Sequence, residues 1–473
     1  MAFIQGEAVN QGSLFPVSLD ELIPQDHLVR VVCAYVDRLS LADLGFAKAQ
    51  AKATGRPPYD PADMLKLYLY GYLHRIRSSR RLEAECLRNV EVMWLLGRLS
   101  PDFKTIAEFR RLNGKAFIRV CRGFVQFCRR AGLMAGELVA IDGSKFQAAA
   151  SRRHYQSAAQ LAKQQQVLEQ QIAGYLAELD RGDKQEALSP LDRSAVQSAL
   201  RQLQDRRQQI LDQQTVLSEQ DVSGHNPTEP EARMMRTAHG KRVAYNVQTA
   251  VDADHGLIVH HEVTQDASDN RQLLPVAQAA KQVLAQDALV VVADAGYSNG
   301  EQFKACEEQG IEAYVPSQRA VNNQGDGRHF GREAFRFDPA TDSWQCPNGK
   351  DMARKQSSRR SVVYASKPED CAACPLKPQC TSAKRRFITR HAQEDAFERM
   401  QMRLAARPEM MSRRRQTVEH PYGNLKQWIM GNGRFVLWGL RGARTEMALA
   451  VTAYNLKRAM NILGTARMMA LLA

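Results

Sequence analysis

Two separate apolar runs, each leading into an aspartate, constrain the fold of this chain more than any other feature. Leu138–Ile141 precedes Asp142, and the stronger run Ala288–Ala293 precedes Asp294. A continuous apolar run is typical of a central strand that is covered on both faces of a sheet. We therefore expect an α/β sheet in which Asp142 and Asp294 each end a strand, at the edge where such sheets bind ligands.

A third acidic residue, Glu419, lies in a polar and basic stretch. Arg415 precedes it by one helical turn, so the two share a face, and Lys426 lies two turns beyond Glu419. An exposed helix with ion pairs between neighbouring turns is the ordinary explanation of this pattern. That explanation does not account for Tyr422 and Trp428, which are interleaved among the cations.

Two strand-end aspartates and a distant glutamate are a set that a sheet protein gathers around paired Mg²⁺ ions for phosphodiester chemistry. We predict that Asp142, Asp294 and Glu419 are the catalytic residues. The same three would hold two Mg²⁺ ions, or Mn²⁺. This interpretation makes the chain a DNA strand-transfer enzyme.

The charge of the chain agrees with a nucleic-acid partner. Its 473 residues include 65 Lys and Arg against 51 Asp and Glu, a net charge of +14, with a pI of about 9.4. Residues 401–473 alone hold twelve basic residues against three acids, Glu409, Glu419 and Glu446. Cationic surfaces gain affinity for phosphate backbones by releasing counterions, so we expect double-stranded DNA as the partner.

Residues 1–135 are predicted to form an all-α N-terminal domain. Asp60-Pro61 supplies a helix cap and a first-turn proline, and further helices are expected near Arg80 and Thr105. Arg77, Arg80 and Arg81 cluster at one turn, which permits a helix-turn-helix-like DNA contact. A small bundle with an ordinary solvated face is the alternative.

The remaining segments predict a discontinuous catalytic core with two insertions. Strands and helices alternate in the order of an RNase H-like mixed sheet, which we assign to residues 136–155, 230–320 and 401–465. Residues 156–222 show heptad-like apolar spacing on two stretches, broken before Ser189-Pro190, and predict a helical hairpin insertion.

The second insertion, residues 321–400, contains four cysteines. Cys346 precedes a Pro-Asn-Gly turn, and Cys371, Cys374 and Cys380 follow with one Cys-x2-Cys spacing. Such a set is a candidate structural zinc site. An iron–sulfur cluster on the same ligands, or four free thiols, are the alternatives. The other five cysteines lie in apolar helical surroundings and are predicted core residues.

The sequence also predicts where the protein works. No stretch reaches the ~18 uninterrupted apolar residues of a membrane span, and the N-terminus lacks the pattern of a secretory signal. Nine cysteines in such a chain indicate a reducing compartment. We expect a cytoplasmic, nucleoid-associated protein without a membrane partner.

The chain resembles the bacterial insertion-sequence transposases of the DDE class that carry a Tyr-Arg-Glu-Lys signature. It is most similar to the group of insertion sequences numbered eleven eighty-two. Matching motifs occur along nearly the whole chain and are Gly55–Pro61, Ile76–Arg80, Ile141–Gly143, Ala293–Tyr297 and Arg415-x3-Glu419-x6-Lys426. The chain departs from the signature at its tyrosine, where Ser412 stands.

The resemblance implies a transposase that binds element ends and target DNA and acts as a homodimer assembled on DNA. It implies that Arg415 and Lys426 lie along the DNA near the scissile phosphate and position it. Two rival functions are a metal-dependent nuclease of the same fold and a non-catalytic DNA-binding protein derived from a transposase. A haloacid-dehalogenase-type phosphatase would need an acid where Ser144 stands.

Overall fold

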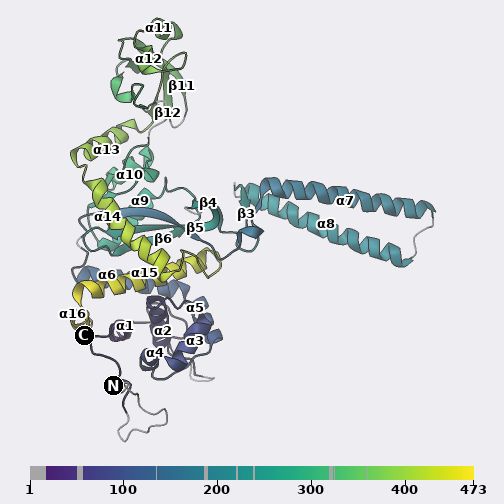
Figure 1. Ribbon diagram of the computed structural model, residues 1–473, viewed down its shortest axis with the longest axis vertical. Helices are drawn as coiled ribbons and strands as arrows, with labels where there is room; N and C mark the ends of the chain where they lie inside the picture. The colour runs from purple at the N-terminus through teal and green to yellow at the C-terminus, as the bar shows by residue number, and fades with distance from the viewer. Residues whose placement is uncertain are drawn as a thin grey trace, which may run out of the picture.

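The computed structural model describes residues 17–50, 57–134, 136–185, 190–219, 222–237, 240–318, 323, 325–358 and 361–473. Gly55, Arg56 and Ser189, which belong to motifs discussed above, lie outside the described residues. Figure 1 shows an elongated body with the first helices at one end, a small β unit at the other, and a helical hairpin that projects from the middle.

The centre of the body is a mixed six-stranded sheet in the order β4–β5–β1–β7–β8, with β6 also paired to β5. β1 is antiparallel to β5 and parallel to β7, and β7 is parallel to β8. The strands are β1 (Val139–Gln147), β4 (Arg233–Thr237), β5 (Gly240–Asp252), β6 (Ile258–Thr264), β7 (Leu289–Val292) and β8 (Ile311–Tyr314). The strand predicted before Asp294 is confirmed.

Apolar side chains alternate between the two faces of this sheet, and helices cover both. On one face Ala140 and Val292 pack with Met410 and Val418 of α14 (Met410–Gly423). On the other face, the odd-numbered residues of β1 and β7 that adjoin Ala140 and Val292 pack into the main apolar core. Helix α9 (Leu273–Leu284) contributes to this core. Burial on both faces explains why the strand sequences are apolar without interruption.

The N-terminal helices do not form a separate core. Their bounds are α1 (Leu28–Asp37), α2 (Pro61–Leu73), α3 (Ser79–Arg88), α4 (Val90–Leu95), α5 (Phe103–Leu112) and α6 (Gly114–Arg130). Asp60 caps α2 as expected, because its carboxylate accepts a hydrogen bond of 2.8 Å from the Ala62 N–H. One continuous apolar cluster joins these helices to the central sheet.

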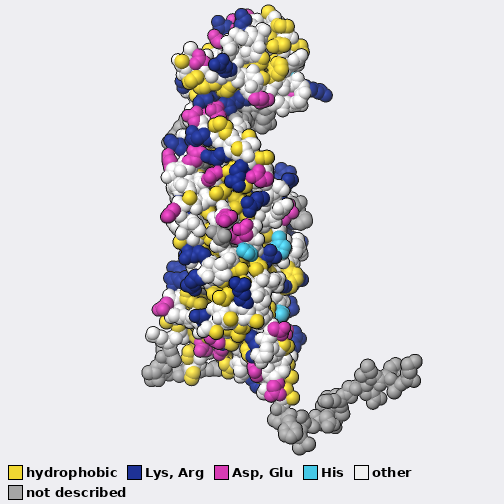
Figure 2. All heavy atoms as spheres, turned by 90° about the vertical axis from the view of Figure 1, so that its left-hand side faces the viewer, with side chains coloured by type: hydrophobic (Ala, Val, Ile, Leu, Met, Phe, Trp, Pro, Cys, Tyr) yellow, Lys and Arg dark blue, Asp and Glu magenta, His cyan; other side chains and the backbone are white. Residues whose placement is uncertain are grey.

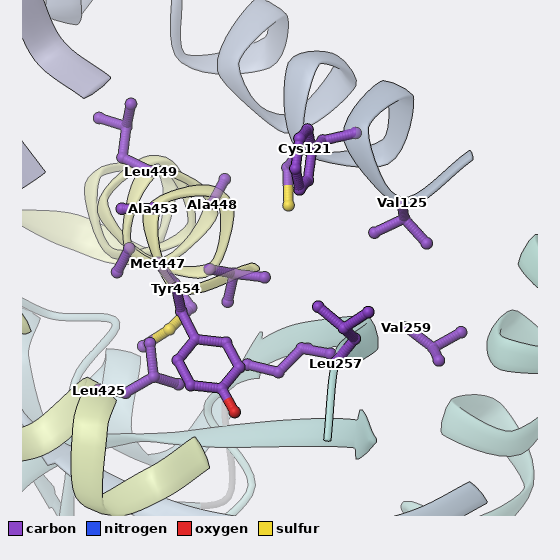
Figure 3. Close-up of a cluster of buried hydrophobic side chains, with 14 of the residues drawn as sticks. Cys121, Val125, Leu257, Val259, Leu425, Met447, Ala448, Leu449, Ala453 and Tyr454 are labelled. Atoms are coloured by element: carbon purple, nitrogen blue, oxygen red, sulfur yellow. The ribbon is translucent and has the colours of Figure 1, made fainter. Parts of the chain in front are cut away.

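The long helix α15 (Gly439–Leu463) connects the two regions. Figure 3 shows Tyr454 of this helix between Leu425 and Leu257, the residue just before β6, with Cys121 of α6 on the opposite side of α15. Asn455 fixes the helix to the sheet, since its amide bonds both the N–H (2.9 Å) and the C=O (2.8 Å) of Ile258. A buried amide whose groups are paired in this way holds one relative position of helix and strand.

A helical hairpin lies between β1 and β4. Its helices α7 (Ala158–Gln185) and α8 (Pro190–Glu219) lie side by side and extend away from the body (Figure 1). Leu161, Leu168, Ile210 and Leu217 are its buried apolar side chains. A short pair of strands, β2 (Gln156–Ser157) and β3 (Gly224–His225), closes its base.

The cysteine-containing segment folds into a second sheet with the order β13–β12–β11–β10–β9. Its elements are β9 (Arg336–Asp338), β10 (Ser343–Gln345), β11 (Asp351–Ser357), β12 (Ser361–Ala365), α11 (Pro368–Ala372), α12 (Lys377–Cys380) and β13 (Phe387–His391). All pairings are antiparallel. We did not anticipate this sheet, because its strands are short and few of their side chains are fully buried.

The chain then returns to the body through α13 (Glu394–Ala406) and α14, and it ends with α16 (Thr465–Leu472) after α15. Between β7 and β8 lies α10 (Gly300–Glu308). α14 contains Pro421 and continues directly into a π-helical turn, η5 (Asn424–Ile429). No helix of the described residues is long and apolar enough to cross a membrane.

Candidate active site

Parallel pairing of β1 with β7 brings Asp142 and Asp294 together. The two strands pair only at Val139 with Val291 and at Ala140 with Val292. Each aspartate lies two residues beyond the last pair and therefore points to the same face as Ala140 and Val292. The aspartates thus lie side by side where the two strands part, which is the position at which α/β sheets bind ligands.

The two aspartates differ in their backbone setting, and one prediction is corrected. We expected the strand to stop after Asp142, but β1 continues to Gln147 because Asp142 and the residues after it remain paired to β5, with Asp142 opposite Thr249. Asp294 does follow the end of its strand. Its carboxylate accepts a hydrogen bond of 2.8 Å from the Gly296 N–H and caps the short turn Ala295–Tyr297.

Arg414 of α14 lies between the two carboxylates. Its Nη2 is 2.9 Å from Oδ1 of Asp142 and 3.6 Å from Oδ2 of Asp294. Burial raises the pKa of Asp142 to about 6; the Arg414 charge opposes this shift and the neighbouring Asp294 adds to it. The site is therefore a carboxylate pair whose mutual repulsion is offset by one cation.

Tyr422 anchors α14 over this point. Its hydroxyl lies 2.8 Å from the carbonyl oxygen of Asp142 and 2.9 Å from that of Val247, and it is placed to donate to both. The ring is buried and lies against Phe146. Arg414 and Tyr422 are two turns apart, so one face of α14 holds both the cation and the anchor.

A second polar cluster lies on the other side of Asp142. Asp269 pairs with the Lys145 ammonium at 3.0 Å and accepts hydrogen bonds of 2.7 Å from the amides of both Asn246 and Gln248. A side chain on Gly143 would not fit, since its Cβ would lie 2.5 Å from Oδ1 of Asp269. Close packing of carboxylate against strand thus explains the glycine after Asp142.

The structure places Lys426 near Asp142 and shows Glu419 on the exposed face of α14. Lys426 lies in η5, with its ammonium 5.2 Å from the Phe146 ring centre. Burial lowers its pKa, the charge of Asp142 opposes this shift, and Lys145 adds to it. Glu419 and Arg415 are exposed on α14. Among the residues that the structure describes, no contact joins the Glu419 carboxylate to either aspartate.

The three arginines that we predicted as N-terminal DNA contacts have different surroundings. Arg77 is bound inside the protein, where its Nη1 pairs with the fully buried Glu446 at 2.6 Å and contacts the carbonyl of Arg434 at 2.8 Å. Its guanidinium therefore joins α15 to the N-terminal helices. Arg80 and Arg81 are exposed on α3, and Arg80 lies over the Phe103 ring at 4.9 Å.

On the face that Figure 2 draws, basic side chains are not gathered in one patch. Figure 2 shows Lys and Arg mixed with Asp and Glu over the face that it draws. In the described part of the chain, no group of three His, Cys, Asp or Glu side chains is arranged to hold a metal ion. The four late cysteines nevertheless line one cavity at the end of the β unit.

Sequence reasoning missed Arg414, Lys145 and Asp269. A sequence pattern could have identified Arg414. Met410, Val418, Tyr422 and Leu425 are buried at helical spacing on α14 and η5, and Arg414 occupies the missing position of that series. Lys145 and Asp269 are 124 positions apart in the chain, and no local pattern connects them.

Two parts of the chain match known protein families. Residues 17–112 match a family described as Transposase domain (DUF772), and residues 345–460 match one described as Transposase DDE domain. Both matches are to transposase domains. They support a DNA transposase. The first covers α1 to α5, and the second covers the cysteine-containing unit from the end of β10 onward and the helices with Arg414, Glu419 and Lys426.

The other two comparisons add little to the transposase assignment. A search of solved structures gives the cryo-EM structure of a piggyBac transposase synaptic complex with hairpin DNA, with 8% identity over 96% of this chain and 78% of that chain. The TM-score of 0.31 does not establish a common fold. No curated protein matches the chain.

Proposed function

We propose that the chain is the transposase of a bacterial insertion sequence, related to the group numbered eleven eighty-two, which cleaves element ends and joins them to target DNA. One observation carries the proposal. The register of β1 and β7 sets Asp142 beside Asp294, and the basic helix α14 with Glu419 lies across that point. The antiparallel-then-parallel strand order β6–β5–β1–β7–β8 supports an RNase H-like core.

The donor set fits divalent metal. Asp142, Asp294 and Glu419 would supply the oxygen ligands that Mg²⁺ or Mn²⁺ prefers, and the Arg414 guanidinium between the aspartates supports a site that attracts positive charge. Two such ions, when bound, supply a nucleophile at neutral pH and stabilise the leaving oxygen of a phosphodiester. Glu419 would turn toward the aspartates from the exposed face of α14.

The residues around the aspartates have distinct proposed roles. Tyr422 fixes the backbone of Asp142, and the Lys145–Asp269 pair fills the space beside Gly143, so the carboxylate of Asp142 is held in one orientation. Lys426 brings a partly buried cation near that carboxylate, where it would meet a DNA phosphate. Arg415, exposed one turn before Glu419, would contact the adjoining backbone.

Double-stranded DNA is the proposed partner, both as element end and as target, and a homodimer assembled on DNA is the proposed active form. The +14 charge of the chain and the twelve basic residues of its last 73 positions support this partner. Arg80 and Arg81 on α3 are the proposed contacts of the N-terminal region, because both are exposed. The charge of Arg77 is already neutralised within the protein by its ion pair with Glu446.

The test is a cleavage and strand-transfer assay on DNA that carries the sequences flanking the reading frame, where terminal inverted repeats are expected. Asp142→Asn, Asp294→Asn and Glu419→Gln should each abolish cleavage with Mg²⁺ present and leave DNA binding largely intact. Asp287→Asn is the matched control, since Asp287 is exposed just before the opposite end of β7. Cleavage without joining would indicate a nuclease, and binding without cleavage a non-catalytic DNA-binding protein.

A further inference from the structure

The β unit at the end of the molecule brings four cysteines from two separate segments to one cavity. Cys346 lies in the turn between β10 and β11, and the other three lie in or next to α11 and α12 (Figure 1). All four line the same small cavity: Cys346, Cys371, Cys374 and Cys380. The remaining five cysteines of the chain lie elsewhere, in helices of the body.

Each cysteine segment has a tight backbone turn. At Cys346 the N–H of Gly349 donates to the Cys346 carbonyl at 2.8 Å, and the Cys346 N–H donates to the Lys350 carbonyl at 2.9 Å. Gly349 has a φ of +72°, which favours glycine at this place. At the second segment the N–H of Lys377 donates to the Cys374 carbonyl at 3.2 Å. Both segments thus present thiols from turns, as structural metal sites commonly do.

The apolar core of this unit is too small to account for its order. Its buried apolar side chains are Phe335, Trp344, Met352, Tyr364 and Ile388. Most side chains of β11 are exposed. Folding costs ~1–2 kcal/mol of backbone entropy per residue, and small units with so little burial usually need a covalent or metal cross-link. Among the described cysteines none forms a disulfide.

Charge at the cavity also indicates an anionic occupant. Arg386 is buried, and its guanidinium donates to the carbonyls of Cys380 at 2.9 Å and of Phe330 at 2.8 Å. Its Nε is buried without a hydrogen-bond partner, and in the described part of the chain no carboxylate pairs with it. Lys350 and Lys377 line the same cavity, against one acid, Asp370. A buried cation is expected to lie near an anion.

The four thiols are close enough to influence one another. Burial raises the pKa of Cys380, Arg386 opposes this shift, and the other three cysteines add to it. Neutral thiols carry no charge that would draw them together, and in the structure the four are not arranged as a metal site. They lie on turns and short helices around one cavity, and zinc binding would draw them inward.

We propose that Cys346, Cys371, Cys374 and Cys380 bind one structural Zn²⁺ that holds the β9–β13 unit together. On binding, four thiols release four protons to solvent and form four Zn–S bonds, which leaves a net charge of −2 on the site. Arg386, Lys350 and Lys377 balance that charge. The proposal is independent of the function proposed for the aspartates.

The test is elemental analysis of the full chain, purified without chelator and then offered Zn²⁺. We expect about one zinc per chain and its loss in the Cys371→Ser/Cys374→Ser variant. Cys33→Ser is the matched control, because Cys33 is also only partly buried but lies in α1 and bonds Asp37. Replacement of Zn²⁺ by Co²⁺ should give the visible absorption bands of a tetrahedral thiolate site.

If the double variant folds poorly, hydrogen exchange measured on the unaltered protein with and without zinc still tests the proposal. Removal of zinc from the unaltered protein should release protection in residues 336–391 and leave the central sheet protected. Absence of zinc after titration, zinc retained in the double variant, or unchanged exchange on zinc removal would each overturn the proposal. Iron with acid-labile sulfide would replace it with a cluster on the same ligands.

Discussion

Arg414 and Asp142 form an ion pair of 2.9 Å that joins helix α14 to strand β1. The same guanidinium reaches Asp294 at 3.6 Å, so it occupies the space between two carboxylates that our proposal assigns to metal. Arg414 is mostly buried, with 15% of its side chain exposed. It therefore stabilises the aspartate pair in the free protein and competes with any divalent cation that binds there.

The first prediction follows from this competition. Arg414→Gln should raise the affinity of the free protein for Mn²⁺ about tenfold, which corresponds to about 1.4 kcal/mol, because the competing cation is removed. Isothermal titration of the protein without DNA measures this change. Arg415→Gln is the control, since Arg415 is the exposed neighbour on the same helix. Equal affinities in both variants and the unaltered protein would separate Arg414 from the metal site.

The second prediction concerns the anchor of α14. Tyr422→Phe should lower the free energy of unfolding by about 1–3 kcal/mol, because two buried carbonyls lose their shared donor. It should also slow cleavage, since the helix that carries Glu419 is less firmly held. Urea unfolding measures the first effect and the cleavage assay the second. A variant as stable as the unaltered protein would show that the hydroxyl does not anchor the helix.

The third prediction is an acid sensitivity located at β6. His260 and His261 line a small cavity with Arg122 of α6. Burial, with added repulsion from Arg122, lowers the pKa of His260 to about 4. Burial, His260 and Arg122 lower the pKa of His261 to about 3. Both pKa values lie below the ordinary 6.5 of histidine. At a pH between the lowered pKa of each histidine and 6.5, the unfolded chain therefore binds more protons than the folded chain.

The contribution of these two histidines to the free energy of unfolding is thus fully present above pH ~6.5, and it is lost as the pH falls toward 4. Between pH 7 and pH 5 we expect a loss of about 1 kcal/mol or more per histidine. The His260→Asn/His261→Asn variant should lose less stability over that range. His154→Asn, at an exposed histidine of the hairpin base, should behave as the unaltered protein. Urea midpoints at the two pH values decide between these outcomes.

Local patterns were sufficient to predict most elements of the fold. The apolar run before Asp294 has the length and composition of a buried strand, and Asp60 has the position of a cap before Pro61. The end of β1 was predicted wrongly for a physical reason. Ser144 and Lys145 are polar, which is typical of a turn, but pairing with the long buried strand β5 keeps them extended.

The candidate site was less accessible from sequence, because its geometry depends on long-range contacts. The register that sets Asp142 beside Asp294 joins residues far apart in the chain, and only the shared strand-end pattern suggested that the two meet. Helical phase gives the relation of Arg415 to Glu419 but not which side of α14 faces the sheet. That side is fixed by Tyr422 and Val418, and it brings Arg414 to the aspartates.

The fourth prediction tests the DNA partner through salt. Each phosphate contact releases counterions, so log K should fall with log[NaCl] with a slope of about −0.9 per contact. We expect a slope steeper than about −3 for non-specific duplex, because several exposed Lys and Arg would contact the backbone. A nearly flat plot, measured by fluorescence anisotropy, would contradict DNA as the partner.

The same measurement assigns the contribution of the N-terminal region. Arg80→Gln/Arg81→Gln should make the slope shallower by about 2, since two phosphate contacts are lost. Arg88→Gln is the control on the same helix α3, because its guanidinium already pairs with Glu85 at 2.6 Å and its charge is partly neutralised within the protein. If the slope of the double variant equals that of the control, Arg80 and Arg81 do not contact DNA, and the basic residues around α14 carry the binding.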